Sequence, residues 1–165
     1  AIDYGTKRTG ILLEVIFVLE TAGKKGIDVD RFLPNTPLRI IVNHSGINVT
    51  KDYSVDLLNK QLIPGRIDDM LDNETLVETI LPNMLETATT LAEQLQEKEI
   101  AQGLQRMNQT LDHEIERLAT LHQQNKSIRS DEIRTALDEK NMLIELIGNA
   151  KIRMDSLQLI REGVL

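Results

Sequence analysis

The sequence predicts an α+β fold in which a small antiparallel sheet carries a long projecting antiparallel helical hairpin. Three observations lead to this fold class. Residues 1–50 contain short runs dense in β-branched residues and bounded by glycine or proline, which is typical of strands. Residues 73–124 repeat apolar side chains at steps of three and four, the period of one helix face. Residues 152–160 alternate again, which indicates a strand that returns to the sheet.

Two strands are expected in the first part of the chain. Residues 11–19 are apolar on both sides of the run, which favours a strand buried on both faces. Residues 23–26 contain two glycines and predict a turn or a flexible link. Residues 38–42 form the second strand, and Pro34 and Pro37 mark its entry because proline cannot donate to a ladder.

The segment after the second strand changes from strand-like to helical. Residues 43–46 have the composition of a turn, and residues 47–49 are expected to return as a short strand. Residues 53–63 predict a short helix closed by a Pro-Gly pair. Residues 66–71 are then a connector.

A long helix is expected over residues 73–124. Asp72 or Asn73 is its cap, and Pro82 either kinks the helix or begins a new one. The apolar stripe slips in phase near Gly103, which predicts a bend or a change of packing partner. At 1.5 Å per residue, such a helix is roughly 75 Å long, so part of it is expected to project as an arm.

The last third of the chain is expected to complete the hairpin and the sheet. Residues 125–129 are the turn, and Ser130 caps a second amphipathic helix that ends near residues 148–149. The alternation in residues 152–160 slips at 155–156, so we expect a bulged strand there. A helix over this last segment is the alternative.

Composition excludes several classes of site. The chain has 165 residues and no cysteine, which excludes disulfide scaffolds, thiolate zinc sites, iron–sulfur sites and cysteine nucleophiles. The longest apolar run, residues 11–19, is interrupted by Glu14 and is far shorter than the roughly 20 residues that span a bilayer. The chain begins with Ala1, so we expect it to be an excised part of a longer protein.

Net charge is −7 and is concentrated in the middle of the chain, where residues 67–124 hold 12 acidic and 3 basic side chains. A nucleic-acid-binding surface is usually basic, so the acidic charge of this segment argues against nucleic-acid binding there. The four aromatic residues are too few for a base-stacking platform. An acidic helix can instead meet a basic protein surface. The candidate partner-binding residues are Glu86, Glu93, Glu97, Glu114 and Glu116.

The sequence offers no catalytic, cofactor-binding or metal-binding residue. Gly5 and Gly10 have the glycine spacing of a phosphate loop, but the Lys and Ser/Thr that hold phosphate and magnesium do not follow. His113 begins a zinc-protease pattern, but Arg117 occupies the second ligand position. His44 and the serine after it have no evident acid partner for a catalytic group.

One stretch resembles a known family. Residues 31–40 are similar to the start of the C-terminal domain of the RapA (HepA) family, bacterial SWI/SNF-type ATPases associated with RNA polymerase. The residues that carry the motif are Arg31, Phe32, Leu33, Pro34, Pro37 and Arg39. The order of residues 10–20, 58–62, 125–133 and 155–160 is also similar to the family pattern. The two prolines favour a stiff, extended turn, and Phe32 and Leu33 are expected to lie under the sheet.

The resemblance implies the end of a spacer region in residues 1–30 and the C-terminal domain in residues 31–165. It implies a non-catalytic module of an ATP-dependent helicase-like protein that recycles RNA polymerase in transcription. The ATP and magnesium sites belong to ATPase lobes absent from this chain, and nucleic acid is bound through those parts. The implied partners are core RNA polymerase and the ATPase and spacer domains of the same protein, in the bacterial cytoplasm near the nucleoid.

Two other hypotheses remain open. The chain could be a stand-alone acidic helical hairpin that binds a basic partner, or a small enzyme with an unrecognised site. The missing catalytic constellation argues against the enzyme.

Overall fold

A computed structural model describes residues 10–22, 26–66, 70, 72–124 and 130–162. Most of the possible phosphate loop, most of the 23–26 turn and the hairpin turn at 125–129 lie outside these residues, as does most of the 66–71 connector. The chain forms two compact units. One comprises Ala1–Val18, Pro37–Gln94 and Arg153–Leu165, and the other comprises Leu19–Thr36 and Leu95–Ile152.

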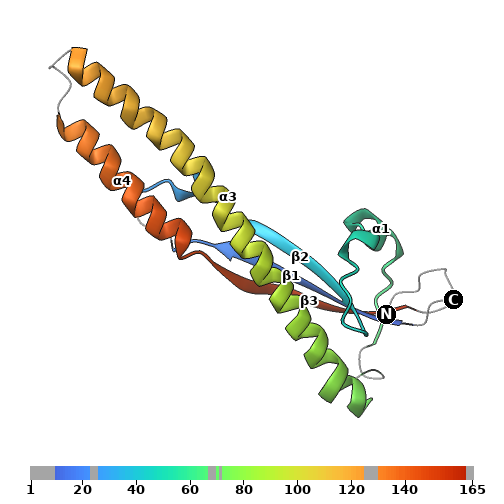
Figure 1. The fold of residues 1–165 in the computed structure, drawn as a ribbon. Coiled ribbons are helices and arrows are strands. Elements are labelled where there is room, and N and C mark those ends of the chain that lie inside the picture. Colours follow the sequence, from blue (N-terminus) through green and yellow to red (C-terminus); the bar gives the residue numbers. More distant parts are fainter. Residues whose placement is uncertain (1–9, 23–25, 67–69, 71, 125–129, 163–165) are drawn as a thin grey trace. The chain divides into compact units, whose positions relative to one another are not determined.

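The sheet has three antiparallel strands in the order β2-β1-β3 (Figure 1). Strand β1 is Gly10–Glu20, β2 is Thr36–Asn43 and β3 is Lys151–Glu162. The α+β class is therefore confirmed. The last segment is a strand that returns to pair with β1, so the alternative of a helix there is wrong. The bulge expected inside it stays a prediction.

The two faces of the sheet are buried to different degrees. Along β1, Leu13 and Val15 lie on a face whose residues are almost all fully buried. The residues that alternate with them lie on the other face, and most of these are half-buried. Leu12 is the exception on the second face. It joins a core cluster with Ile41, Tyr53, Leu58 and Ile160. Helix α1, Val55–Gln61, supplies Leu58 to that cluster.

Helix α1 is shorter than the 53–63 expected from composition. It begins after Ser54, whose Oγ accepts a hydrogen bond from the Leu57 N–H at 3.2 Å. The expected strand at 47–49 is wrong, because only one isolated bridge forms there, between Val42 and Asn48. The turn before it is present, and Gly46 takes a φ of 74°, which a residue without Cβ adopts at low cost.

The entry to the long helix shows how the chain accommodates Pro82. The Asn73 side chain accepts from the Leu76 N–H at 3.1 Å, so Asn73 is the cap. A π-helical turn, η3 (Leu76–Ile80), follows and leads directly into α3, Leu81–Gln124. Pro82 has no N–H to donate to the preceding turn, and a widened turn just before it is a common local adjustment. Pro82 is therefore the second residue of the regular α-helix α3, and the π-helical turn joins α3 to the cap at Asn73.

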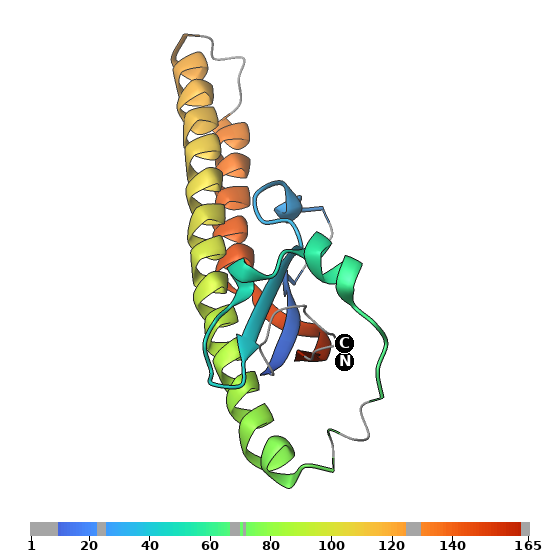
Figure 2. The same ribbon diagram turned by 90° about the vertical axis from the view of Figure 1, so that its right-hand side faces the viewer.

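Helix α3 buries different residues in the two units. In the first unit the buried positions are Met84, Ala88 and Ala92. In the second unit they are Gly103, Met107 and Leu111. Within the first unit, the start of α3 lies on the face of the sheet opposite α1 (Figure 2). The change of packing partner predicted from the phase slip is confirmed.

The second unit is built on a helical pair. Helix α4, Ser130–Gly148, runs antiparallel beside α3 and buries Leu143 and Ile147 (Figures 1 and 2). A short 3-10 helix, η1 (Val29–Arg31), contacts α4. Among the described residues, no helix is both long and apolar enough to cross a membrane.

Phe32 and Leu33 are buried, but in the helical unit rather than under the sheet. The Arg106 guanidinium on α3 donates to the Phe32 carbonyl at 2.9 Å. Gly103 makes this approach possible. A Cβ at that position would lie 3.3 Å from the Phe32 carbonyl oxygen and 3.5 Å from Ile147 Cγ2. The expectation that these residues lie beneath the sheet is therefore wrong.

Candidate protein-interaction surface

The five predicted partner-binding glutamates all lie on α3 and are exposed. None of their carboxylates forms an ion pair with another described residue. Glu86, Glu93 and Glu97 follow one another at spacings of seven and four, so they share one helix face. Glu114 and Glu116 are two residues apart and point in nearly opposite directions. The five residues do not form one patch.

The two long helices nevertheless carry an excess of negative charge. Helix α3 has seven acidic and three basic residues, and α4 has five acidic and two basic residues. Such a surface attracts basic partners, and the attraction weakens as salt shortens its range.

A half-exposed apolar strip lies where α4 meets α3 in the second unit. Lys140 on α4 pairs with Asp112 on α3, with 2.5 Å between Nζ and Oδ1. Leu137 and Ile144 are three residues before and four after Lys140, so they share its helix face. Their side chains are 44% and 41% exposed. This is unusual for large aliphatic residues at a helix–helix contact.

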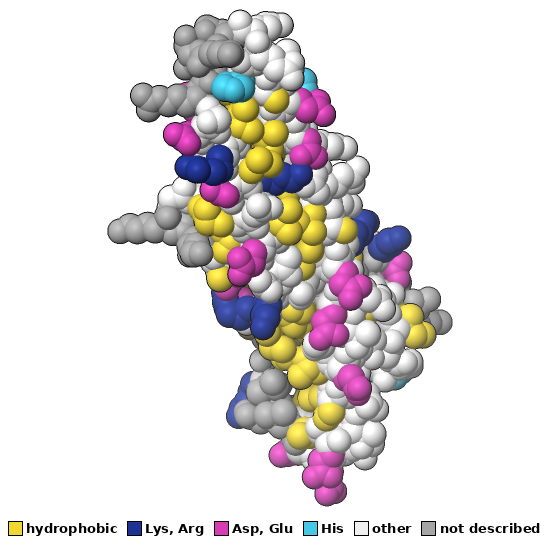
Figure 3. Space-filling view, turned by 60° about the vertical axis from the view of Figure 1, so that its left-hand side comes forward, with side chains coloured by type: hydrophobic (Ala, Val, Ile, Leu, Met, Phe, Trp, Pro, Cys, Tyr) yellow, Lys and Arg dark blue, Asp and Glu magenta, His cyan; other side chains and the backbone are white. Residues whose placement is uncertain are grey.

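The α3 side of this strip is also partly apolar. Ile115 and Glu116 are three and four residues beyond Asp112 and share its face. We call Ile115, Leu137, Ile144 and the Asp112–Lys140 pair the hairpin seam. Figure 3 shows hydrophobic side chains gathered along the hairpin, with acidic side chains on both sides. Glu116 is the predicted glutamate that borders the seam.

The opposite side of the helical pair is covered. Arg106 is nine residues before Ile115, half a turn around α3, and it holds the segment that follows η1. Among the residues that the structure describes, the seam is thus the side of the pair that no further segment covers. Sequence periodicity missed it, because Leu137 and Ile144 fit the apolar stripe of α4 and look like core positions. The signal in the sequence was the wide arc that the apolar residues of α4 occupy around the helix.

The family-like motif of residues 31–40 contributes structural contacts, with residues 31–36 in the second unit and residues 37–40 in the first. Arg31 lies over the Phe32 ring, with its guanidinium carbon 5.2 Å from the ring centre. The Thr36 hydroxyl donates to the Pro34 carbonyl at 2.8 Å and supports the turn into β2. Pro37 is the second residue of β2 rather than a residue before it.

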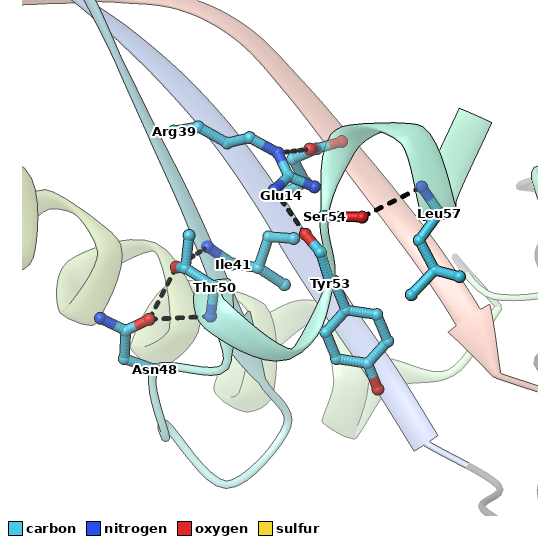
Figure 4. Close-up of polar contacts among 8 residues, drawn as sticks. All are labelled: Glu14, Arg39, Ile41, Asn48, Thr50, Tyr53, Ser54 and Leu57. Carbon is cyan, nitrogen blue, oxygen red and sulfur yellow. Dashed lines mark hydrogen bonds and ion pairs between the residues drawn. The ribbon is translucent and has the colours of Figure 1, made fainter.

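Arg39 is the motif residue with the most polar contacts (Figure 4). Its Nε donates to Glu14 Oε1 at 2.5 Å, and its Nη1 donates to the Tyr53 carbonyl at 2.6 Å. The side chains of Arg39 and Glu14 are only 18% and 12% exposed. Arg39 therefore joins the central strand to the segment that leads into α1.

Further hydrogen bonds hold the same segment. Thr50 Oγ1 accepts from the Ile41 N–H at 2.8 Å, and Asn48 Oδ1 accepts from the Thr50 N–H and hydroxyl. The Tyr53 hydroxyl donates to the buried carboxylate of Glu162 at the end of β3. The network fixes α1 on the sheet. No group of three or more metal-ligating side chains occurs among the residues that the structure describes.

Comparison with known proteins defines the class of protein to which this fold belongs. Residues 3–161 match the family described as "RNA polymerase recycling family C-terminal". The chain belongs to this family, and the resemblance found in residues 31–40 is confirmed.

Curated relatives carry the name "RNA polymerase-associated protein RapA". The relative from Pasteurella multocida is 35% identical over 154 residues, and that from Vibrio campbellii is 32% identical over 152 residues. The relative from Actinobacillus succinogenes is 33% identical over 156 residues. Each match covers 91% of this chain but only 16% of the relative, so the chain spans about a sixth of their length. The spacer boundary expected after residue 30 stays a prediction.

Proposed function

We propose that this chain is the non-catalytic C-terminal module of an ATP-dependent, helicase-like protein that recycles RNA polymerase during transcription. Family membership and the shared name of the relatives support the link to polymerase. In this proposal ATP, magnesium and nucleic acid are bound by other parts of the protein. The protein acts in the bacterial cytoplasm, where it reaches the nucleoid through polymerase.

The module contributes by protein contact, and the hairpin seam is the observation that carries this proposal. Leu137 and Ile144 are large, apolar and half-exposed, and they lie on a helical pair with excess negative charge. An apolar centre with a charged rim is the usual anatomy of a protein interface. The complementary partner surface has apolar side chains surrounded by Lys and Arg, and we place it on core RNA polymerase.

The test is a titration of the 165-residue chain against core RNA polymerase at two salt concentrations. The double variant Leu137→Lys, Ile144→Lys should weaken binding at least tenfold, because it puts cations into the apolar centre of the contact. Val55→Lys on α1 is the matched control, since Val55 is also a half-exposed aliphatic residue but lies outside the seam. Circular dichroism of each variant checks that it is folded.

Two outcomes would overturn the proposal. One is equal binding by the seam variant and the control. The other is no binding by the folded unmodified chain.

Charge reversal separates the seam from the general acidity of α3. Glu116→Lys should weaken binding and flatten its salt dependence, because Glu116 borders the seam. Glu114→Lys makes the same charge change on the other side of the helix and should have a smaller effect. Equal effects would mean that only net charge matters for binding and that the seam has no special part.

An ATP hydrolysis assay on the 165-residue chain tests the non-catalytic part of the proposal and should give no turnover.

A further inference from the structure

Strand β3 is an outer strand of the sheet that the described residues form. In the described part of the chain β1 is its only neighbour in the sheet. All six residues from 153 to 158 are exposed. An outer strand presents a row of unpaired backbone N–H and C=O groups, and natural proteins usually shield such edges or use them for pairing.

The shielding of β3 is uneven along its length. Its first half carries Lys151, Arg153 and Asp155, and charges of this kind discourage pairing with another strand. Residues 156–160, Ser-Leu-Gln-Leu-Ile, contain no charge and no proline. Charged residues flank this stretch, with Asp155 before it and Arg161 and Glu162 after it, so residues 156–160 are the part of the edge that can accept an added strand.

A groove runs beside this unshielded part. It is lined by residues 62–66 and Met70 and by residues 157–159 of β3. Its volume is about 380 Å³, and its lining combines apolar side chains with Arg66 and Gln158 and contains no carboxylate. Ile63 and Leu157, which both line it, are 53% and 49% exposed. We call this the edge groove.

We propose that an extended segment of the same polypeptide, from outside these 165 residues, pairs with residues 156–160 as a fourth strand and places apolar side chains in the edge groove. Main-chain hydrogen bonds supply affinity in such strand addition, and pockets for alternate side chains supply specificity. The inference rests on the proposed function, which places this chain within a longer protein.

The length of the relatives argues for an occupant within the same polypeptide. The aligned part is 16% of each relative, so most of such a polypeptide lies outside the module. A tethered segment sees its site at an effective concentration that reaches the millimolar range, so a short strand with weak intrinsic affinity suffices.

Amide hydrogen exchange tests this proposal, with residue-level resolution from electron-transfer fragmentation. The full-length protein and the 165-residue chain are compared, both without polymerase. In the full-length protein, alternate amides within residues 156–160 should exchange at least 100-fold more slowly than in the chain alone. The alternation is diagnostic, because only every second amide of an outer strand points to the open edge.

Three results would overturn the proposal. Equal exchange in the two proteins would mean that the edge stays open. Slowing of every amide, without alternation, would mean that a surface covers β3 without strand pairing. Alternating protection in the chain alone that grows with its concentration would identify a second copy as the occupant.

A matched pair of full-length variants links the protection to the groove. Ile63→Lys should remove the alternating protection, and Val55→Lys, at an equally exposed position on α1, should leave it unchanged. Persistence of the protection in Ile63→Lys would overturn the role of the groove. Polymerase is absent, so failure here leaves the seam proposal standing, and failure of the seam titration leaves this one standing.

Discussion

Replacing Arg39 by methionine should destabilise the sheet unit strongly. The substitution keeps the length of the side chain but removes the cation that bonds Glu14 and the Tyr53 carbonyl. Both partners of the ion pair are largely buried, so water cannot fully replace the lost contacts. Breaking a buried pair from one side costs about 3–5 kcal/mol, because it leaves an uncompensated charge. The pair retains some exposure, and we expect a loss of about 3 kcal/mol in the free energy of unfolding.

Urea unfolding of the 165-residue chain measures this loss. The chain has two tyrosines and no tryptophan, and Tyr53 is buried beside the substitution, so tyrosine fluorescence reports on the right unit. The transition midpoint should fall while the slope with urea stays constant. Arg134→Met is the matched control. It breaks an exposed pair with Asp131, worth at most about 1 kcal/mol.

A double variant gives the sharper test. Glu14→Gln with Arg39→Met removes both charges, so it should be less destabilised than the sum of the two single variants by roughly 1–3 kcal/mol. The reasoning is refuted if Arg39→Met costs no more than Arg134→Met. It is equally refuted if the double variant shows no coupling.

Three further perturbations test other parts of the fold. Ile40→Asp places an unpaired charge in the core and should abolish the cooperative thermal transition followed by circular dichroism. Gly103→Leu should lower stability by about 1–3 kcal/mol in urea through overpacking, whereas Gly148→Leu, with nothing within 4 Å of its added Cβ, should cost far less. Tyr53→Phe leaves the buried Glu162 carboxylate without its donor and should cost about 1–3 kcal/mol, measured by the urea midpoint; an unchanged midpoint would count against that hydrogen bond.

The sequence predicted the elements well where local periodicity decides them. Both outer limits of the strand at 11–19 lie within one residue of β1, and the long helix was expected from its apolar spacing. The fate of Pro82 was harder to predict, because kinks, new helix starts and π turns all relieve the same missing hydrogen bond. The bridge at Asn48 replaced a strand because Asn48 and Thr50 use their side chains for local turn bonds.

The interaction surface was predicted only in its charge. Counting acidic residues found the excess on α3, but Glu114 and Glu116 diverge because helical phase separates residues two positions apart. Leu137 is half-exposed because another segment of the chain packs against a different side of the helical pair. That neighbour, the segment around Phe32, is recruited by Gly103 and Arg106 from more than 70 residues away, and the sequence does not encode such a contact locally.

The place of β1 in the middle of the sheet has a consequence during synthesis on the ribosome. Strand β2 follows β1 closely, but 130 residues separate the end of β1 at Glu20 from the start of β3 at Lys151. At about 5–20 residues per second, this interval is on the order of ten seconds. During this interval, the edge of β1 that later pairs with β3 has no partner strand. Because β1 is the more apolar strand of the nascent β1–β2 pair, this edge can bind chaperones or pair wrongly until β3 emerges.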